Sequence, residues 1–286
     1  MRKVSLEQGS QEWLSWRKTV ITATDASIIM GNNPWDTPYK CWQRKLGLIE
    51  EKVSNEAMER GKRLEPEARA QFIERYGIHM TPEVVESSEF DFLGASLDGI
   101  SENGNKLLEV KCGGSKLHTM ACKGEIPPYY MDQMQHQLLV TGADMCFYYS
   151  YDGTDGICIE VFPDPEYSKN FIPKAREFWK CVALSEPPPL QDKDYVDMSE
   201  EPAWRLLAAE YRQVDEQIKS LEKIKENFRK DLLNLCGDQS CLGQGIKVMK
   251  TVMKGRVAYD EIPELKVIDL DKYRKSAITT WKILVA

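Results

Sequence analysis

Two acidic residues and a lysine in the stretch Gly94–Lys111 have types and spacing suited to metal-dependent chemistry. Glu109 and Lys111 are two positions apart, so in a β-strand their side chains would project to the same face. Asn103-Gly104, upstream of them, is the dipeptide most typical of a β-hairpin turn. Such a turn would fold Asp98 back towards Glu109. The stretch therefore predicts that the carboxylates of Asp98 and Glu109 and the ammonium group of Lys111 lie on one wall, called the acidic wall below.

This wall has two interpretations. Two carboxylates can bind Mg²⁺, or Mn²⁺ in its place, and the ion would lower the pKa of a bound water and stabilise charge on a phosphate. The lysine could then orient or deprotonate the attacking water, or neutralise the transition state. Alternatively, Asp98 begins an ordinary turn, and Glu109 and Lys111 form an ion pair that binds nothing. The hairpin signal and the flanking apolar residues favour the first interpretation.

The composition indicates an ordinary protein that folds around a core. A length of 286 residues allows one large domain or a domain with an appendage, and 42% of the residues are hydrophobic. The net charge of −7 argues against a wholly basic nucleic-acid coat but allows a local basic track. We find no secretory signal and no run of 18 apolar residues, and the eight scattered cysteines contain no CxxC pair. These features predict reduced thiols, a cytoplasmic location and no membrane contact.

The N-terminal region contains a candidate anion site. The sequence predicts a short helix over Gln11–Lys18 and a second over Asp25–Met30, preceded by Thr22 and Thr24. The free N–H groups of a helix N-terminus and nearby hydroxyls can bind a phosphate, to which Arg17 could add a bidentate contact. The residues alone favour a simpler interpretation, in which the threonines only cap the helix and Arg17 is a surface charge.

The next two predicted helices span residues 34–52 and 54–77. The first has an apolar side that is more typical of a core than of a base-stacking platform. That side consists of Trp35, Tyr39, Trp42 and Leu46. The second helix contains Glu65, which could reach the acidic wall as a third carboxylate. The sequence alone favours an exposed position for Glu65.

The remaining elements of the first two thirds of the chain follow from apolar periodicity and from proline and glycine boundaries. A strand, turn and strand are predicted over 78–92, before the hairpin. After Lys111, the segment with Lys116, His118 and Lys123 is either a mobile basic loop that contacts a DNA backbone or a solvated connection. The other predictions are a helix over 127–142, strands over 145–151 and 156–162, and a helix over 165–183.

The C-terminal third is predicted to be an appendage. Residues 186–200 are a proline-rich linker after a domain spanning 1–185, and the appendage spans 201–286. Residues 202–236 carry about four heptad repeats, so this long helix should pair with another helix or with a copy of itself. Strands are expected over 241–253 and 256–262, and a short basic segment over 269–280.

Four blocks of the sequence, in this order, resemble one family. They are W-x2-WR…VITATDAS, RGKRLEPEAR, GASLDGI…LLEVKC and YMDQMQHQLLVTG, within residues 8–183. The chain resembles the phage-type alkaline exonucleases, the λ-exonuclease or YqaJ-like recombinase group of the PD-(D/E)xK nuclease superfamily. The resemblance implies an α/β (mixed α+β) fold with a restriction-endonuclease-like core, in which helices flank a central mixed β-sheet. The C-terminal helical and β appendage lies outside it.

The resemblance also implies a role for individual residues. Metal ligands would be Asp98, Glu109 and the backbone carbonyl of Val110. Further catalytic residues would be Lys111, Glu65, which reaches the metal from a helix, and Gln133, which orients the site from the following helix. The 5′-phosphate of the digested strand would be bound by Arg17, Thr24 and Ser96. The chain departs from the family at Cys112-Gly113, where the family has cysteine-proline, so Lys116 or His118 is a candidate for the next phosphate contact.

The activity implied is Mg²⁺-dependent 5′→3′ digestion of double-stranded DNA to 5′-mononucleotides, which leaves 3′ single strands for recombination. Family members often form trimeric rings, so a homo-oligomer is expected. The usual partner is a single-strand annealing protein, and the setting is a phage or prophage in the cytoplasm of a bacterial host. Two alternatives stay open: a PD-(D/E)xK endonuclease of phage origin, and a non-catalytic DNA-binding or assembly module.

Overall fold

The structure is a computed structural model that describes residues 1–50, 56–251, 255, 262, 263 and 268. The chain forms two compact units, Met1–Tyr195 and Val196–Ala286. The division between them falls inside the segment 186–200, for which the sequence predicts a linker. The acidic wall and the candidate anion site both belong to the first unit.

The first unit is built on a central sheet, which has six strands among the described residues. The strands lie side by side in chain order, β1 (Arg2–Val4), β2 (Met80–Glu86), β3 (Gly94–Ser101), β4 (Lys106–Lys111), β5 (Met145–Tyr151) and β6 (Gly156–Val161). Strands β4 and β5 are parallel, and each of the other neighbouring pairs is antiparallel. The sheet is therefore mixed, as predicted.

The hairpin β3–β4 confirms the fold-back predicted from Asn103-Gly104. Gly104 has a φ of +75°, a conformation that L-residues with a side chain rarely adopt. The Ser101 hydroxyl donates to Asn103 Oδ1 (2.8 Å) and accepts from the Lys106 N–H (3.0 Å), which closes the turn. The two strands pair through Gly99 with Leu108 and Ile100 with Leu107, so the start of β3 lies beside the end of β4.

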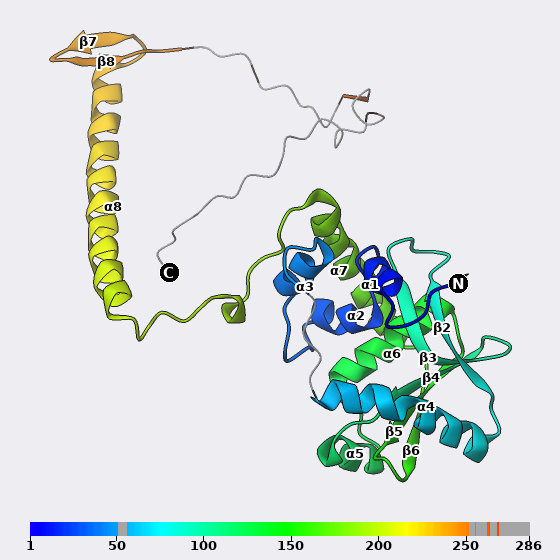
Figure 1. The fold of residues 1–286 in the computed structure, drawn as a ribbon. Coiled ribbons are helices and arrows are strands. Elements are labelled where there is room, and N and C mark those ends of the chain that lie inside the picture. Colours follow the sequence, from blue (N-terminus) through cyan, green and yellow to red (C-terminus); the bar gives the residue numbers. More distant parts are fainter. Residues whose placement is uncertain (51–55, 252–254, 256–261, 264–267, 269–286) are drawn as a thin grey trace. The chain divides into compact units, whose positions relative to one another are not determined.

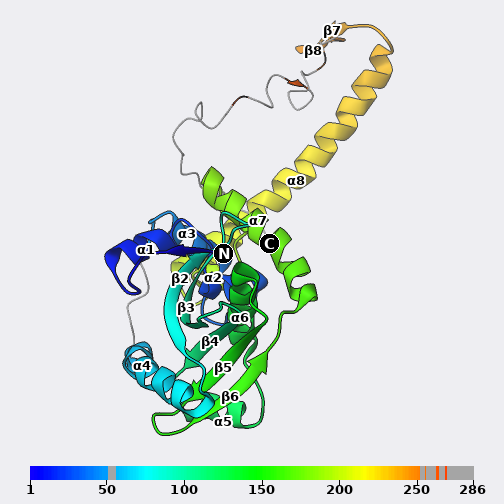
Figure 2. The ribbon, with the colours of Figure 1, turned by 90° about the vertical axis from the view of Figure 1, so that its right-hand side faces the viewer.

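Helices cover both faces of the sheet. On one face lie α2 (Ala23–Met30), α6 (Pro128–Thr141) and α7 (Pro165–Leu184), and α6 packs on β2, β3 and β5. On the other face α4 (Glu56–Tyr76) buries Ala68 and Phe72 against Leu108, Val110 and Tyr149. Figures 1 and 2 show α4 and α6 on opposite sides of the strands. Leu108 and Val110 thus point into a core, as predicted from their alternation with Glu109.

Most helix boundaries follow the capping signals in the sequence. Ser10 caps α1 (Gln11–Arg17), Thr22 and Asp25 form a capping box at the start of α2, and Gly142 ends α6 in the left-handed conformation. The helix α3 (Pro38–Lys45) is shorter than the predicted 34–52. Thr37 accepts a hydrogen bond from the Lys40 N–H, so the chain has a second, better start signal that moves the helix to Pro38.

Two predictions of local structure are wrong. The segment after β4 is not a loop, because Ser115–Cys122 form the helix α5, which buries Ala121. Its apolar residues recur at the i, i+3 and i+4 positions of a helix, a pattern that its glycines obscured. The second strand predicted within 78–92 is replaced by a turn, in which the Ser87 hydroxyl accepts from the N–H groups of Glu89 and Phe90.

The second unit contains α8 (Pro202–Cys236), as predicted, and a small hairpin of β7 (Cys241–Gly243) and β8 (Ile246–Val248). The single strand predicted over 241–253 is wrong, because Gln244-Gly245, both at positive φ, turn the chain back. The segments 256–262 and 269–280 lie largely outside the described residues. Apolar side chains along α8, from Leu207 to Phe228, are exposed. Among the described helices, none has the length and apolar character needed to cross a bilayer.

His136 on α6 is fully buried beside β3. Its Nε2 lies 2.9 Å from the Gly94 carbonyl oxygen, so Nε2–H donates there, and its Nδ1 has no hydrogen-bond partner. Burial lowers the pKa of His136 to about 4. The imidazole is therefore neutral in the folded protein at neutral pH.

We expect this histidine to make the fold sensitive to mild acid. An exposed histidine in the unfolded chain has a pKa of about 6.5, so between pH 6.5 and 4 the unfolded chain binds the extra proton and folding weakens as pH falls. This difference in pKa lowers the free energy of unfolding by about 3 kcal/mol at pH 4 and does not change it above neutral pH. Urea unfolding at pH 7, 5.5 and 4.5 measures it, and His136→Phe should flatten the slope. Equal slopes for both proteins would contradict this prediction.

Candidate active site

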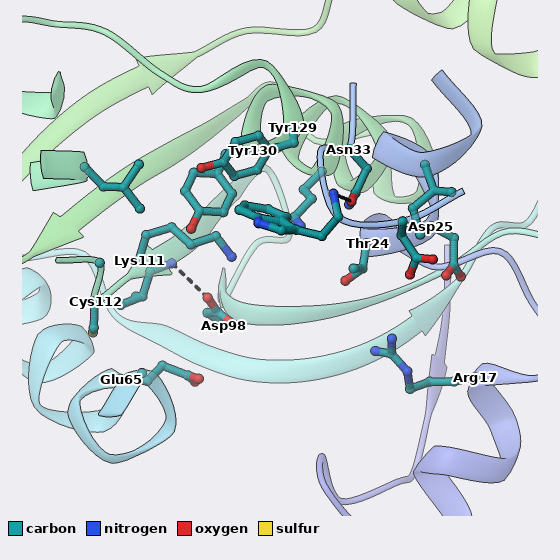
Figure 3. A pocket seen from close by; sticks show the side chains of 18 of the residues that line it. Arg17, Thr24, Asp25, Asn33, Glu65, Asp98, Lys111, Cys112, Tyr129 and Tyr130 are labelled. Atoms are coloured by element: carbon teal, nitrogen blue, oxygen red, sulfur yellow. Dashed lines mark hydrogen bonds between the residues drawn. The ribbon is translucent and has the colours of Figure 1, made fainter. Parts of the chain in front are cut away.

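The facing ends of β3 and β4 bring Asp98, Glu109 and Lys111 together. The strand pairing ends at Gly99 and Leu108, and beyond it Asp98 Oδ2 accepts the Val110 N–H at 2.8 Å. Figure 3 shows Asp98 and Lys111 side by side in the middle of the site. Lys111 Nζ forms an ion pair with Glu109 Oε1. The arrangement has the two carboxylates and the ammonium group on one wall.

The charges on this wall shift the pKa of Asp98 and the pKa of Lys111. Burial and the negative charges of Glu109 and Glu65 raise the pKa of Asp98 well above its ordinary value. Burial opposes the charge on Lys111, but Glu109 and Asp98 outweigh it and raise the pKa of Lys111. The side chain of Glu109 is almost completely buried. The wall therefore holds more negative charge than Lys111 alone balances.

Glu65 lies at the same site, on α4, and not on the exposed surface that the residues alone favoured. Its Oε1 accepts a hydrogen bond from Arg69, one turn later, at 3.2 Å, and Arg69 also donates to the Asp98 carbonyl oxygen. Burial and the charge of Glu109 raise the pKa of Glu65, with Arg69 acting in the opposite direction. The packing of α4 against β4 brings this glutamate to the wall.

The glutamines of α6 approach the wall from the other side of the sheet from α4. Gln137 donates to Glu109 Oε2 (2.6 Å), and its own Oε1 is buried without a hydrogen-bond partner. Gln133, one turn earlier, lines the cavity in front of the wall. Gln137 is thus a site residue that the sequence did not single out, although the four-residue spacing places the two glutamines on one helix face.

The donor set fits a hard divalent cation. Asp98, Glu109 and the carbonyl of Val110 offer oxygen ligands, and Mg²⁺ typically uses one or two carboxylates and keeps several waters. The crowding of the carboxylates, which raises the pKa of Asp98 and of Glu65, also favours a bound cation. Among the described residues, no group of three or more His, Cys, Asp or Glu side chains is already arranged as a metal cage. The fit therefore rests on two carboxylates, a carbonyl and water.

A cavity of about 970 Å³ connects the acidic wall to the candidate anion site. Asp98, Lys111 and Glu65 line one end of it, and Arg17 and Thr24 line the other, as Figure 3 shows. Thr24 lies in the first turn of α2, where the N–H groups that the capping box of Thr22 and Asp25 does not use can bind an anion. The structure thus brings two predicted phosphate-binding residues into the same cavity as the acidic wall.

Ser96, the third predicted phosphate ligand, does not line this cavity. Its hydroxyl accepts a hydrogen bond from the Trp13 indole at 2.7 Å, and the Arg17 guanidinium lies over the Trp13 ring, 4.7 Å from its centroid. Ser96 therefore connects to Arg17 through Trp13. A direct contact between Ser96 and a phosphate stays a prediction.

A buried ion pair supports the anion end of the cavity. Asp25 Oδ2 accepts from Lys45 Nζ (2.5 Å) and from the N–H and hydroxyl of Thr22 (2.8 Å each). Lys45 Nζ also donates to the carbonyl oxygens of Arg17 and Val20, at 2.6 Å each. Burial acts to raise the pKa of Asp25, but Lys45 and Arg17 outweigh it and lower the value. This pair ties α3 to the segment that carries Arg17 and Thr24.

The segment after β4 lines the cavity with Cys112, Gly113, Gly114 and Leu117, and not with the predicted basic residues. Arg60 lines the cavity and donates to the carbonyl oxygens of Cys112 (3.2 Å) and Gly113 (3.1 Å). Lys116 and His118 do not line it, and His118 Nδ1 lies 3.1 Å from Ser150 Oγ. Arg60 belongs to the RGKRLEPEAR block, but no feature of the sequence predicts that it approaches Cys112-Gly113.

The profile of the YqaJ-like viral recombinase domain matches residues 12–144, which include the acidic wall, the anion site and the glutamines of α6. This part of the chain is similar to a YqaJ-like viral recombinase domain. The match confirms the family predicted from the four sequence blocks, and the YqaJ-like domain accounts for the residues that meet in the cavity.

Related proteins and solved structures support the same family. The chain is 28% identical over 236 residues to the YqaJ protein of Bacillus subtilis (strain 168), covering 77% of this chain and 74% of that protein. It is 30% identical over 154 residues to the R354 protein of Acanthamoeba polyphaga mimivirus, covering 49% and 28%.

Among solved structures, the alkaline exonuclease LHK-Exo from Laribacter hongkongensis, in its complex with dAMP, matches with a TM-score of 0.55 and 26% identity. The match covers 62% of this chain and 94% of LHK-Exo. The fold with its central mixed sheet is thus that of the alkaline exonucleases. The similarity to the YqaJ-like domain and to LHK-Exo supports a nuclease, a hydrolase, as the class of this enzyme.

Proposed function

We propose that this chain is a Mg²⁺-dependent exonuclease that digests double-stranded DNA in the 5′→3′ direction to 5′-mononucleotides and leaves 3′ single strands. The observation that carries the proposal is a cavity lined by Asp98, Lys111, Arg17 and Thr24, with the buried Glu109 paired to Lys111 directly behind it. One end of the cavity has the groups for phosphodiester hydrolysis, and the other end has groups for a terminal phosphate.

In this proposal each residue has a distinct task. Asp98, Glu109 and the Val110 carbonyl would hold the divalent ion, with Glu65 nearby on α4. When bound, the ion supplies Lewis-acid polarisation of the phosphate and a more acidic water. Lys111, held by Glu109, contributes a positive charge beside the reacting phosphate. Gln137 holds the second oxygen of Glu109, and Gln133 faces the same cavity.

The anion end of the cavity gives the proposed reaction its direction. Arg17 is fixed over Trp13, and Thr24 lies at the N-terminus of α2, so a terminal 5′-phosphate has both a guanidinium and free N–H groups to bind. A strand anchored there by its 5′ end would present its first phosphodiester to the acidic wall. Digestion would then proceed from the 5′ end, one nucleotide at a time.

The assay that tests the proposal compares linear with covalently closed circular duplex DNA, with and without Mg²⁺. We expect mononucleotides from linear DNA with Mg²⁺ and no cutting of circles. Cutting of the circles would identify the endonuclease alternative instead. Binding of DNA without any divalent-dependent product would support the non-catalytic alternative. Replacement of Mg²⁺ with Mn²⁺ in the same assay tests the choice of metal.

Arg17→Ala should reduce digestion of 5′-phosphorylated ends more than of 5′-hydroxyl ends. A charge-assisted hydrogen bond to a phosphate contributes about 1.5–3 kcal/mol, so the phosphorylated substrate should lose roughly 10- to 100-fold in initial rate. Initial rates on matched duplexes that differ only in the terminal phosphate measure this. Equal losses on both substrates would remove Arg17 from the phosphate site.

The proposed biological setting is recombination by single-strand annealing. The viral recombinase family supports an origin in a phage or prophage. We further propose that the chain acts in the cytoplasm of a bacterial host. The 3′ single strand left by the reaction is the substrate that a single-strand annealing protein would bind. We also propose that the chain forms a homo-oligomer, a trimer by resemblance, which would keep the enzyme on its DNA.

A further inference from the structure

One wall of the cavity is aromatic, and the proposed reaction does not yet use it. It consists of Trp35, Tyr129 and Tyr130, called the aromatic wall below. The ring centroids of Trp35 and Tyr129 are 4.9 Å apart, and those of Tyr129 and Tyr130 are 4.5 Å apart. Figure 3 shows Tyr129 and Tyr130 on the side of the cavity away from Glu65 and Arg17.

Tyr130 connects this wall to the reacting groups. Lys111 Nζ lies 4.9 Å from the centroid of the Tyr130 ring, which is also 6.1 Å from the ring of Tyr148. The face of Tyr130 is therefore occupied by the lysine. Trp35 and Tyr129 continue the wall outwards from that point, so a group held by them lies next to the phosphate at Lys111.

Trp35 is the exposed member of the wall, and its backbone is fixed. Its side chain is 64% exposed, unlike Trp42, which is buried, so the prediction of a core stripe over 34–52 is wrong for Trp35. The Trp35 N–H donates to Asn33 Oδ1 (3.0 Å), and Asn33 Nδ2 donates to Ser27 Oγ (3.0 Å). A fixed loop thus holds a large apolar ring in the solvent of the cavity, an arrangement typical of a binding surface.

We propose that Trp35 and Tyr129 form a nucleobase-stacking surface that takes up the unpaired base of the nucleotide being removed. The inference rests on the proposed function and adds the form in which the substrate binds. A base within a duplex has its faces covered by neighbouring pairs, so an aromatic ring reaches a face only after the base leaves the stack. The terminal nucleotide would therefore bind unpaired, with its 5′-phosphate at Arg17 and Thr24, the phosphodiester on its 3′ side at Lys111 and its base on the aromatic wall.

Such a surface suits an enzyme that removes every nucleotide in turn. All four bases have a π face, so stacking tolerates any sequence, whereas hydrogen bonds to base edges would select one base. Alanine substitution of a stacking aromatic residue typically costs about 1–3 kcal/mol per base, equivalent to roughly 5- to 150-fold. The stacking would also offset the cost of opening the terminal base pair.

The test is a double-mutant cycle between the protein and the DNA. Wild type and Trp35→Ala digest matched 5′-phosphorylated duplexes that carry either a normal or an abasic nucleotide at the first, second or third position. We expect the abasic nucleotide at one of these positions to slow the wild type by about ten-fold or more. Trp35→Ala should be slow on the normal duplex and should lose little further on the abasic one.

Control variants separate stacking from other effects of the substitution. Trp35→Phe should recover most of the rate, whereas Trp35→Leu should not, because leucine is apolar but has no π face. Trp204→Ala removes another exposed tryptophan, at 56% exposure, from α8 and should leave the rate unchanged. The same double-mutant cycle with Tyr129→Leu tests the second ring of the aromatic wall. It replaces the cycle with Trp35→Ala if that variant fails to fold.

Two results would overturn the inference while the proposed function stands. One is a Trp35→Ala protein that digests the normal duplex at the wild-type rate. The other is an equal loss from the abasic nucleotide in wild type, Trp35→Ala and Tyr129→Leu. A wild type that digests no DNA at all, with normal or abasic ends, would instead contradict the proposed function.

Discussion

Lys111→Ala is expected to abolish hydrolysis of linear duplex DNA. The substitution removes the ammonium group that lines the cavity beside Asp98 and pairs with Glu109. Removal of a charged group that stabilises a transition state typically lowers the rate by about 10²–10³-fold, and loss of the orientation of Glu109 would add to this. Release of acid-soluble nucleotides from labelled linear DNA, with saturating Mg²⁺, measures the rate.

A matched control exists on the same strand. Lys106 begins β4, does not line the cavity, and lies with its Nζ 6.0 Å from the Phe147 ring centroid. Lys106→Ala should therefore keep the wild-type rate. Far-ultraviolet circular dichroism and a urea midpoint establish that both variants fold. A folded Lys111→Ala protein with full Mg²⁺-dependent activity would refute the role of Lys111.

Lys45→Met is expected to destabilise the first unit by about 3–5 kcal/mol. The Lys45 and Asp25 side chains are only 6% and 9% exposed, so removal of the ammonium leaves a buried carboxylate without its counter-charge. The backbone carbonyls of Arg17 and Val20 lose the same donor. Because a domain is stable by only about 5–15 kcal/mol, the unfolding midpoint in urea should fall markedly.

Two further variants decide whether the buried charge of Asp25 causes the loss of stability in Lys45→Met. In the double variant Asp25→Asn with Lys45→Met, the uncompensated charge is gone, so much of the stability should return. Lys62→Met breaks an exposed ion pair, in which the side chains of Lys62 and Glu59 are 67% and 59% exposed. This substitution should change the free energy of unfolding only slightly. A double variant no more stable than Lys45→Met alone would show that packing, and not charge, sets the loss.

The same ion pair connects stability to the anion site. Lys45 holds the backbone at Arg17, and Asp25 holds the start of α2, where Thr24 lies. The sequence suggested a helix cap here and a possible phosphate contact, but not the lysine beneath them. In the sequence, Lys45 is one of several basic residues of the predicted helix 34–52, and nothing distinguishes it from them. It is buried because α3 packs against α2.

Local signals in the sequence were sufficient to predict the acidic wall. The Asn103-Gly104 turn needs a positive φ at Gly104, and alternation in a strand has a period of two, so these features alone predicted that Asp98, Glu109 and Lys111 would meet. The boundaries of α6 and α8 were likewise predicted from a proline start and a glycine stop. Such signals act over a few residues, and the chain around them cannot easily override them.

What the sequence by itself determined, then, was the family, most of the helices and strands of the first unit, and the three residues of the wall. Only the tertiary structure decided that Glu65 faces the wall and that Trp35 lines the cavity, because each depends on which helix or loop packs where. It also decided that Gln137, and not Gln133, holds Glu109, because the rotation of α6 on the sheet selects between two residues one turn apart. Contacts between residues far apart in the chain leave no periodic pattern, so they are settled by packing alone.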